Sequence, residues 1–427
     1  MKYTLILYML TLGLAIQAQS SAHFGAPKFA PEDGQALLIV GQDLGAVGGL
    51  ATHDDGYIDH VDHIPAGVTT YTSLNTLAGL RTLANWGSGD VNAQAYLEDA
   101  SFDNSCMAIG LYLVNQLDNI IAGNFDGRID ILGNWIKDSG RPVFLRIGYE
   151  FDGSWNDYNA AKYKEAWIYI VNRFDDLEVR NVAYVWQSAG INTPNIERWY
   201  PGDEYINWMA YSHFDGPNPG QSIRTFAVER SKPIMIAEAT PRGRDLKTGD
   251  GRSHWNDWFD PMFQSVYDEN SIKALAYINV NWDAQPQWNG QGWGDSRVQV
   301  NETVLFNWSE EVSEDKWIVA SDTLFQSMQL QLWQDSIMMD EEVVVSAPRF
   351  QKQKELTVFA DRNGLIQIRS ASGKITAVAV YDLSGTQLYE SYDQTTHHSI
   401  SLNHAKGMVI VRTAMDQVTF QDKIIVR

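Results

Sequence analysis

The feature that most constrains the fold is a regular alternation of short apolar runs with longer segments of helical spacing, from about residue 36 to residue 282. Chains that alternate in this way form parallel sheets, because each helix carries the chain back to begin the next strand. The apolar runs are bounded by Gly, Pro, Asn or Asp, and eight of them predict strands, at 36–41, 62–68, 107–113, 142–147, 182–186, 206–211, 233–237 and 272–280.

Helices are expected between these strands, at 117–137, 160–174 and 254–267. Eight strands that alternate with helices over about 250 residues predict an α/β fold, the (β/α)8 TIM barrel. An open, doubly wound sheet is the alternative, which is weakened because the chain lacks a glycine-rich phosphate fingerprint. A helical segment at 309–332 is expected to close the barrel domain, which we place at residues 31–333.

The pattern changes after the barrel. Residues 334–355 are charged and mixed, without clear periodicity, and predict a linker. Residues 356–427 contain short alternating runs with turn residues between them. Runs spaced about 8–12 residues apart in this way predict a small all-β sandwich.

The first residues have the pattern of an export signal. Lys2 precedes an apolar run that ends near Ile16, and the small residue Ala18 stands at the expected cleavage point. This pattern is typical of a secretory signal peptide, which we place at residues 1–18. The remaining segments are shorter than the roughly 18 apolar residues of a membrane span, so we expect an exported protein without a transmembrane segment.

The composition narrows the range of partners. The chain has 32 Lys and Arg against 53 Asp and Glu, a formal net charge of −21, which repels phosphate and argues against binding to nucleic acid. It also has 15 Trp. Tryptophan rings in excess often stack on flat apolar faces such as those of sugar rings, although a tryptophan-rich core is the alternative interpretation.

Cysteine and histidine offer little chemistry. Cys106 is the single cysteine and lies in an apolar run, so we expect a buried, unreactive thiol and no disulfide within the chain. The segment 53–63 contains His53, His60 and His63 among several aspartates. Their spacing matches neither a zinc-binding helix nor an EF-hand loop, so we expect polar loop groups, and no metal and no cofactor.

Two glutamates stand where strands end. Glu150 follows the run at 142–147, and Glu238 follows the run at 233–237 directly. In a (β/α)8 barrel the working residues lie at these carboxyl ends, and an ionisable residue after a buried run is costly unless it is paired or functional. Structural ion pairs at the barrel rim are the alternative. A pair of carboxylates in one barrel mouth is what glycoside hydrolysis with retention requires.

Three motifs in order resemble glycoside hydrolase family 26. Residues 145–155, Leu-Arg-Ile-Gly-Tyr-Glu-Phe-Asp-Gly-Ser-Trp, are similar to its acid/base segment, usually Arg-Pro-x-His-Glu-x-Asn-Gly-x-Trp. Residues 199–211 resemble the segment before and along its sixth strand, and 232–238 its nucleophile strand. With the strand pattern, the resemblance covers about residues 36–300. It implies a retaining β-glycosidase with Glu150 as general acid/base and Glu238 as nucleophile.

The acid/base segment departs from the family pattern at three positions. Tyr149 replaces the usual His, Asp152 the usual Asn, and Ile147 the usual Pro. The first two contact the sugar beside the bond in the family, so we expect Tyr149 and Asp152 to bear on the choice of substrate. The family and its relatives cleave β-mannan, β-1,3-xylan and mixed-linkage β-glucan.

Other residues are assigned to the support of this pair. Arg146 shares the inward face of its strand with Glu150 and is expected to hold Glu238 ionised, with an ordinary core ion pair as the alternative. The resemblance implies that Tyr211 donates a hydrogen bond to Glu238. His213, with Tyr149, is expected to bind sugar hydroxyls.

Aromatic residues are expected to bind the sugar rings. Trp282 follows the eighth strand, where the resemblance implies a floor for the sugar at the bond that is cut. Trp155 is expected to stack as well. Trp288 and Trp293 lie beside a glycine-rich loop and are candidates for further subsites, with a place in the core as the alternative.

The last 70 residues or so resemble the C-terminal sorting domain of the type IX secretion system. The matching segments are 377–385, 407–412 and 423–426. The resemblance implies passage across an outer membrane, followed by release or attachment to the cell surface, with the secretion machinery as partner. A carbohydrate-binding sandwich is the alternative, but no Trp follows Trp333.

Together these features predict a secreted, retaining endo-β-glycosidase that hydrolyses a plant or algal polysaccharide by double displacement. Two alternatives share the barrel. A non-hydrolytic glycan-binding protein is disfavoured by the presence of both glutamates, and a transglycosylase would share the covalent intermediate but exclude water from it.

Overall fold

The computed structural model describes residues 26–215 and 219–330, and in the C-terminal part 356–360, 365–370, 374–382, 386–392, 395–402, 407–415 and 418–426. The chain divides into two compact units between Met339 and Asp340, and each is described by itself. The expected signal peptide at 1–18 and the expected linker at 334–355 lie outside the described residues.

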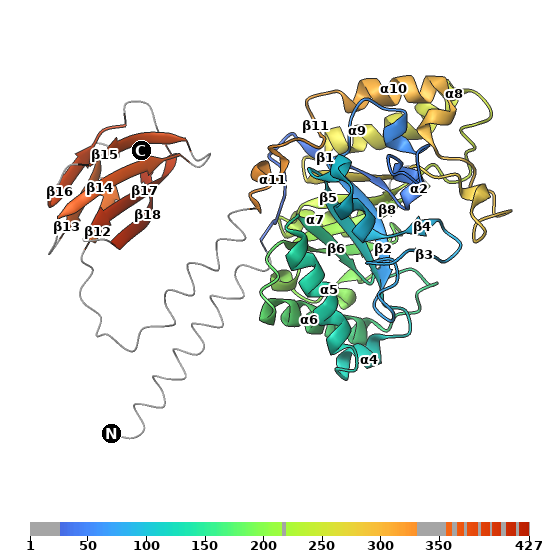
Figure 1. Ribbon diagram of the computed structural model, residues 1–427, viewed down its shortest axis with the longest axis horizontal. Helices are drawn as coiled ribbons and strands as arrows, with labels where there is room; N and C mark the ends of the chain where they lie inside the picture. The colour runs from blue at the N-terminus through green and yellow to red at the C-terminus, as the bar shows by residue number, and fades with distance from the viewer. Residues whose placement is uncertain are drawn as a thin grey trace. The chain divides into compact units, whose positions relative to one another are not determined.

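Eight parallel strands close into a barrel in the first unit (Figure 1). They pair in sequence order, and the last strand pairs again with the first, with Val40 opposite Tyr277. This closure confirms the (β/α)8 prediction and excludes the open sheet. The strands are β1 (Ala36–Gly41), β2 (Gly67–Ser73), β5 (Cys106–Tyr112), β6 (Val143–Ile147), β7 (Val182–Ser188), β8 (Trp208–His213), β9 (Ile234–Ala239) and β10 (Ile272–Ile278).

The strands are apolar throughout because both of their faces are buried. Alternate residues divide between two hydrophobic clusters. Leu38 and Val40 of β1 belong to the cluster between strands and helices, whereas Leu37 and Ile39 belong to the cluster inside the barrel. Much of the inner cluster is alanine, which leaves room for larger polar side chains at the carboxyl ends of the strands.

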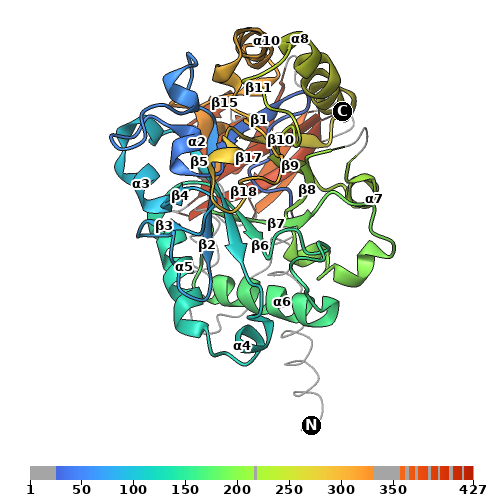
Figure 2. The ribbon, with the colours of Figure 1, turned by 90° about the vertical axis from the view of Figure 1, so that its right-hand side faces the viewer.

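Helices surround the barrel (Figure 2). They are α2 (Leu44–Val47), α3 (Ala93–Glu98), α4 (Leu117–Ile121), α5 (Asp126–Ser139), α6 (Ala160–Asp176), α7 (Gln221–Glu229), α8 (Gly251–His254), α9 (Asp260–Asp268), α10 (Glu302–Val312) and α11 (Leu324–Ser327). Helix α6 matches the expected 160–174 segment and buries the predicted face, which includes Tyr163, Trp167 and Ile170. A π-helical turn at Trp255–Phe259 joins α8 to α9.

Three sequence expectations differ from the structure. The second strand begins at Gly67 rather than at residue 62, because the segment before it folds as turns. The expected 117–137 helix is broken into α4 and α5 at Gly123, whose φ of 75° ends the first helix. The expected 309–332 helix is replaced by the end of α10, the two-residue strand β11 (Trp317–Ile318) and α11.

The described strands of the second unit form two antiparallel sheets, in keeping with the expected small sandwich. One sheet contains β12 (Leu356–Ala360), β13 (Ile366–Ser370) and β16 (His397–Ile400). The other contains β15 (Gln387–Ser391), β14 (Ile375–Tyr381), β17 (Gly407–Met415) and β18 (Val418–Val426). Buried residues of both sheets, among them Ile368 and Val380, share one hydrophobic cluster. Strand β15 was not expected from the sequence.

Two further features bear on function. Cys106 is buried at the start of β5, and burial raises the pKa of its thiol to about 12, which makes the thiolate scarce.

Among the residues that the structure describes, helices long and apolar enough to cross a membrane are absent.

Candidate active site

A cavity of about 530 Å³ opens at the carboxyl ends of the barrel strands, where the fold places working residues. Both candidate catalytic residues line it, and both are buried, with Glu150 7% and Glu238 6% exposed. Aromatic residues from several loops and strands form much of the remaining wall, namely Tyr71, Trp86, Tyr112, Tyr149, Trp155, Phe214, Trp282, Trp288 and Trp293.

Glu238 enters the cavity through a β-bulge in β9. Tyr211 of β8 pairs with Ile236, but the next residue, Ser212, pairs with Glu238, so β9 contains one extra residue here. An extra residue shifts the alternation of side chains. Because Ala237 already faces the inner cluster, a regular strand would point Glu238 outward. The bulge turns its carboxylate toward the barrel axis.

Two donors contact the same oxygen of Glu238. The guanidinium of Arg146 forms an ion pair with Oε1 at 2.5 Å, and the hydroxyl of Tyr71 donates to Oε1 at 3.0 Å. Arg146 is fully buried and also donates to Thr69 at 3.0 Å. A buried guanidinium compensates the charge of a buried carboxylate. Arg146 thus contacts Glu238, the residue with which it was expected to pair.

Glu150 stands on a strained turn after β6. Its own φ is +53°, and that of Gly148 is also +53°. The left-handed region costs a residue with a side chain about 1–2 kcal/mol, so neighbouring contacts must hold it. Asn156 provides them, since its amide donates to the carbonyl oxygens of Tyr149 at 3.1 Å and Glu150 at 2.9 Å.

The surroundings of Glu150 favour its protonated form. Burial is the largest cause and the nearby charge of Glu238 the second, and together they raise the pKa of Glu150 to about 8. Hydrogen bonds from Ser212 to Oε1 at 2.7 Å and from the indole of Trp155 to Oε2 at 3.0 Å act in the opposite direction. One carboxyl group is thus poised to carry a proton while its neighbour is ion-paired.

The structure corrects the places of Tyr211 and His213. Both lie outside the cavity of Glu150 and Glu238, in the wall of a second cavity of about 720 Å³ that Arg224 and Trp258 also line. Tyr211 points outward because Trp208 and Ala210 of β8 face the barrel interior, so the residues between and after them alternate away from it. Tyr71 occupies the place that we assigned to Tyr211.

His213 is buried in this second cavity wall, with its ring 5.5 Å from that of Trp258. Burial, aided by the charge of Arg224, lowers the pKa of His213 to about 4, so its imidazole is neutral near pH 7. His213, which was expected to bind sugar hydroxyls, therefore lies outside the cavity that holds Glu150 and Glu238.

Asp152 also differs from expectation. Its carboxylate accepts hydrogen bonds from Ser188 at 2.6 Å, from the backbone of Ala189 at 2.7 Å and from Thr193 at 2.6 Å. These contacts tie the turn after β6 to the loop after β7. Asp152 therefore acts as a structural anchor for the acid/base turn rather than as a lining residue of the cavity. Tyr149 does line the cavity, with its ring 5.3 Å from that of Tyr71.

The expected sugar-binding tryptophans divide into two groups. Trp155 is 62% exposed and offers a free face at the cavity. Trp282, Trp288 and Trp293 pack against one another, with ring centroids 4.7–5.3 Å apart. Trp282 is buried and donates to Thr240 at 3.0 Å, so it forms a rigid part of the cavity floor.

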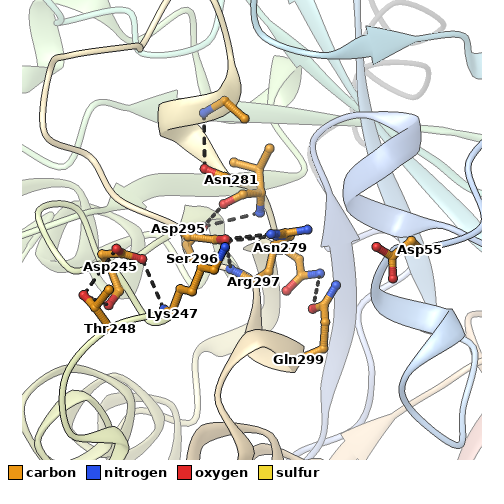
Figure 3. A network of polar contacts seen from close by, with 12 residues as sticks. Asp55, Asp245, Lys247, Thr248, Asn279, Asn281, Asp295, Ser296, Arg297 and Gln299 are labelled. Carbon is orange, nitrogen blue, oxygen red and sulfur yellow. Dashed lines mark hydrogen bonds and ion pairs between the residues drawn. The ribbon is translucent and has the colours of Figure 1, made fainter.

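A polar network holds the tryptophan-bearing loop after β10 (Figure 3). The hydroxyl of Ser296 lies 2.9 and 2.8 Å from the carbonyl oxygens of Ile278 and Val280, and Arg297 forms a two-contact ion pair with Asp295. The loop is therefore closed at its base by residues 295–297. This closure fixes the start and end of the segment that carries the three tryptophans.

The histidine-rich segment contributes to loop structure. His53 lies 3.3 Å from Asp90, and His60 lies 2.7 Å from Asp55. Within the described residues, His, Cys, Asp and Glu side chains form no group of three that could hold a metal ion.

Four polar residues of the site were missed in the sequence. Tyr71 was missed because the second strand was placed too early, and Asn156 because its role is to support a turn. Gln187 and Ser212 are buried near the carboxyl ends of β7 and β8. The sequence could have indicated both, because each continues the alternation of inward residues along its strand. A polar residue at such a position is costly unless it is hydrogen-bonded.

Comparisons with known proteins point to one enzyme family. Residues 100–244 match glycosyl hydrolase family 26, and residues 345–426 match a domain of unknown function, DUF8694. A β-1,3-xylanase from a Vibrio species is 30% identical over 335 residues, which cover 72% of this chain and 71% of that protein. A β-1,3-xylanase from an Alcaligenes species is 30% identical over 337 residues, with 72% and 70% coverage.

Solved structures share the fold. An endo-β-1,4-mannanase from Cellulomonas fimi aligns with a TM-score of 0.51 and 12% identity, over 92% of this chain and 94% of that one. A family-26 β-mannanase from Bacteroides ovatus aligns with a TM-score of 0.50 and 13% identity, over 67% and 91%. With the barrel, the two buried glutamates at strand ends and these relatives, the chain belongs to glycosyl hydrolase family 26 and is a glycoside hydrolase.

Proposed function

We propose that the protein is a retaining endo-β-glycanase that uses Glu238 as nucleophile and Glu150 as general acid/base. The observation that carries the proposal is the contrast between the two carboxyl groups. Glu150 has its pKa raised by burial and by the charge of Glu238, whereas Glu238 is paired with a buried guanidinium. Two carboxyl groups whose environments separate their protonation states are the equipment of a glycosidase.

The proposed reaction has two displacements. In the first, a carboxylate oxygen of Glu238 attacks the anomeric carbon while Glu150 passes its proton to the departing glycosidic oxygen. Because Arg146 and Tyr71 both contact Oε1, we assign the attack to Oε2. In the second, ionised Glu150 takes a proton from water, whose oxygen attacks the same carbon and releases Glu238. The sugar leaves with its starting configuration.

We propose β-1,3-xylan as the substrate to test first. Support comes from the two β-1,3-xylanases, each of which matches 72% of this chain, and from Tyr149 at the position where the resembling family usually has His. Two exposed aromatic residues that line the cavity, Trp86 at 50% and Trp155 at 62%, suit the binding of several sugar rings of a polymer.

The test is product release from β-1,3-xylan, β-mannan and mixed-linkage β-glucan by the wild type, Glu150→Ala and Glu238→Ala. We expect one polymer to be cleaved, with each substitution lowering kcat by at least about 10³-fold. Proton NMR during the first minutes should show the β-anomer as the first product. An α-anomer, or full activity in Glu238→Ala, would overturn the mechanism. Binding without cleavage in the wild type would favour a glycan-binding protein.

We also propose that the protein is exported and that its second unit serves as the sorting signal. Support comes from the apolar leader at 1–18 and from the type IX-like segments at 377–385, 407–412 and 423–426. The test is to express the full chain, and a chain ending at residue 333, in a bacterium that has this secretion system. Loss of enzyme from the medium and the cell surface in the shortened chain supports the proposal, and unchanged export overturns it.

A further inference from the structure

A chain of buried hydrogen bonds joins the two candidate catalytic residues through the barrel interior. Arg146, which pairs with Glu238, also donates to Oε1 of Gln187 at 3.0 Å. The Nε2 of Gln187 donates to the hydroxyl of Ser212 at 3.1 Å, and that hydroxyl donates to Oε1 of Glu150 at 2.7 Å. These five residues come from β6, its following turn, β7, β8 and β9.

The direction of every bond in this chain follows from Arg146. A guanidinium can only donate, so the atom of Gln187 that it contacts must be the amide oxygen. The amide nitrogen of Gln187 then faces Ser212 and donates to it. Because the hydroxyl of Ser212 has a single hydrogen and already accepts from Gln187, that hydrogen is free to point toward Glu150.

We propose that Gln187 and Ser212 are positioning residues which hold Oε1 of Glu150 as an acceptor, so that the proton used in catalysis is carried on Oε2. This inference rests on the proposed acid/base role of Glu150. With the proton on Oε2, Oε1 is the carbonyl oxygen of the acid and accepts the hydrogen of Ser212. A proton on Oε1 would instead have to be accepted by the Ser212 hydroxyl, whose own hydrogen would then lose Glu150 as its acceptor. These hydrogen bonds therefore favour the outer oxygen as the site of the acid proton.

Oε2, the outer oxygen of Glu150, lies on the cavity side, where it can reach the leaving group. Oε2 accepts from the indole of Trp155, which is 62% exposed at the cavity. A carboxylic acid hydroxyl can accept this bond and still donate its own hydrogen to a glycosidic oxygen. When Glu150 is ionised for the second displacement, both bonds persist and stabilise the carboxylate, so neither half of the reaction requires side chains to move.

Charged groups around Glu150 also affect its pKa, in addition to the hydrogen bond from Ser212. Glu238 on β9 and Asp152 in the acid/base turn both disfavour ionisation of Glu150, as does burial. Arg146 on β6 supplies the opposing positive charge through its contact with Glu238. The donated bond from Ser212 lowers the pKa of Glu150 within this setting. Removal of the bond should therefore raise it.

The test measures the protonation of Glu150 directly. The full chain is labelled with ¹³C at glutamate carboxyl carbons, and the Glu150 signal is assigned by its absence in Glu150→Gln. In Ser212→Ala the midpoint of the Glu150 titration should rise by about one pH unit, the size expected for one charge-assisted hydrogen bond. In Gln187→Met, where Ser212 can still donate but is no longer directed, the rise should be smaller.

Two further variants serve as controls. Ser212→Thr keeps the hydroxyl and should restore the wild-type midpoint. Thr70→Val removes another buried hydroxyl, on β2, and should leave the midpoint unchanged. A Glu150 midpoint in Ser212→Ala that is equal to or below that of the wild type would overturn the proposal. A Glu150 midpoint in Gln187→Met that equals the wild-type value would show that Gln187 has no part in it. Gln187→Met also tests the chain should Ser212→Ala fail to fold.

The pH profile of kcat/KM tests whether these hydrogen bonds affect catalysis. If the wild type cleaves a polymer, the alkaline limb of its kcat/KM profile should move to higher pH in Ser212→Ala by the same amount as the titration. If the Glu150 midpoint shifts in Ser212→Ala but the wild type cleaves no polymer, the hydrogen-bond proposal is supported and the proposed function is contradicted. If the wild type is active but neither the midpoint nor the alkaline limb shifts in Ser212→Ala, only the hydrogen-bond proposal is contradicted.

Discussion

The hydroxyl of Tyr71 lies 3.0 Å from Oε1 of Glu238, although 167 positions separate the two residues in the sequence. Tyr71 is the fifth residue of β2, and Glu238 reaches it because the bulge in β9 turns the glutamate inward. The contact places a neutral donor beside the ion pair with Arg146. Burial and the charge of Glu238 raise the pKa of Tyr71, so it remains a donor at any working pH.

We expect Tyr71→Phe to lower kcat by about 10–100-fold, because one hydrogen bond that orients the nucleophile and stabilises its charge is lost. KM should change much less, since the aromatic ring that lines the cavity is kept. The measurement is steady-state kinetics on the polymer that the wild type cleaves.

Tyr211→Phe is the matched control for this prediction. Tyr211 is fully buried, whereas Tyr71 is half-buried, and Tyr211 lies in the wall of the second cavity. Its substitution should leave kcat within about twofold. If Tyr211→Phe lost activity and Tyr71→Phe did not, the original assignment of Tyr211 would stand and the geometry described above would not explain catalysis.

Glu150 should make the folded protein less stable as the pH rises. A carboxyl group whose pKa is raised by folding binds its proton more tightly in the folded state than in the unfolded state. Its contribution is therefore lost between its ordinary pKa of 4.5 and about 8, and stays lost above that. Glu150→Gln removes this effect and should raise the free energy of unfolding at pH 9 by about 1–3 kcal/mol, with little change at pH 4.5.

Chemical unfolding of both proteins at the two pH values measures this difference. Glu310→Gln, which removes a carboxylate from the exposed side of α10, should show the same stability as the wild type at both. A stabilisation by Glu150→Gln that is equal at pH 4.5 and pH 9 would contradict the linkage.

Asp152 should matter for stability more than for sugar binding. Asp152→Ala leaves the three donors that it accepts from without their partner and should lower the free energy of unfolding by about 2–4 kcal/mol. Thr193→Val removes one of the three bonds and should cost about 1 kcal/mol. Denaturant titration distinguishes this role from a sugar contact, which would raise KM and leave stability unchanged.

The thiol of Cys106 should be protected by the fold. It is fully buried, and its raised pKa leaves little thiolate near neutral pH. Native protein should not react with a thiol-specific reagent over an hour, whereas one thiol per chain should react in strong denaturant. Rapid reaction of the native protein would show that the start of β5 opens readily.

The barrel could be predicted because its signals are local. A strand that is buried on both faces needs apolar residues throughout, so its apolar run can be recognised in the sequence. This holds for seven of the barrel strands, namely β1, β5, β6, β7, β8, β9 and β10. The two glutamates could be predicted for the same reason, since Glu238 directly follows such a run and Glu150 comes three residues after the end of another. The position of Arg146 required only the period of two along its strand.

The supporting residues were harder to predict because their positions depend on the registers of several strands. Tyr211 is a polar aromatic residue near the end of β8, and composition alone does not tell which face it occupies. The parity of Trp208 and Ala210, seen in the packed barrel, decides that it faces outward. Asp152 lies two residues after the acid/base glutamate, but the loop after β7 decides what its carboxylate contacts.

The (β/α)8 barrel, the small β-rich second unit and the two carboxylates at strand ends can be predicted from the sequence, because burial and hydrophobic periodicity are properties of short segments. Which side chains surround those carboxylates depends on the folded barrel. A bulge in β9 turns Glu238 inward, and the closed sheet brings Tyr71, Gln187 and Ser212 to the pair from three other strands. Hydrogen bonds act over about 3 Å, so their partners are known only when strand registers are known.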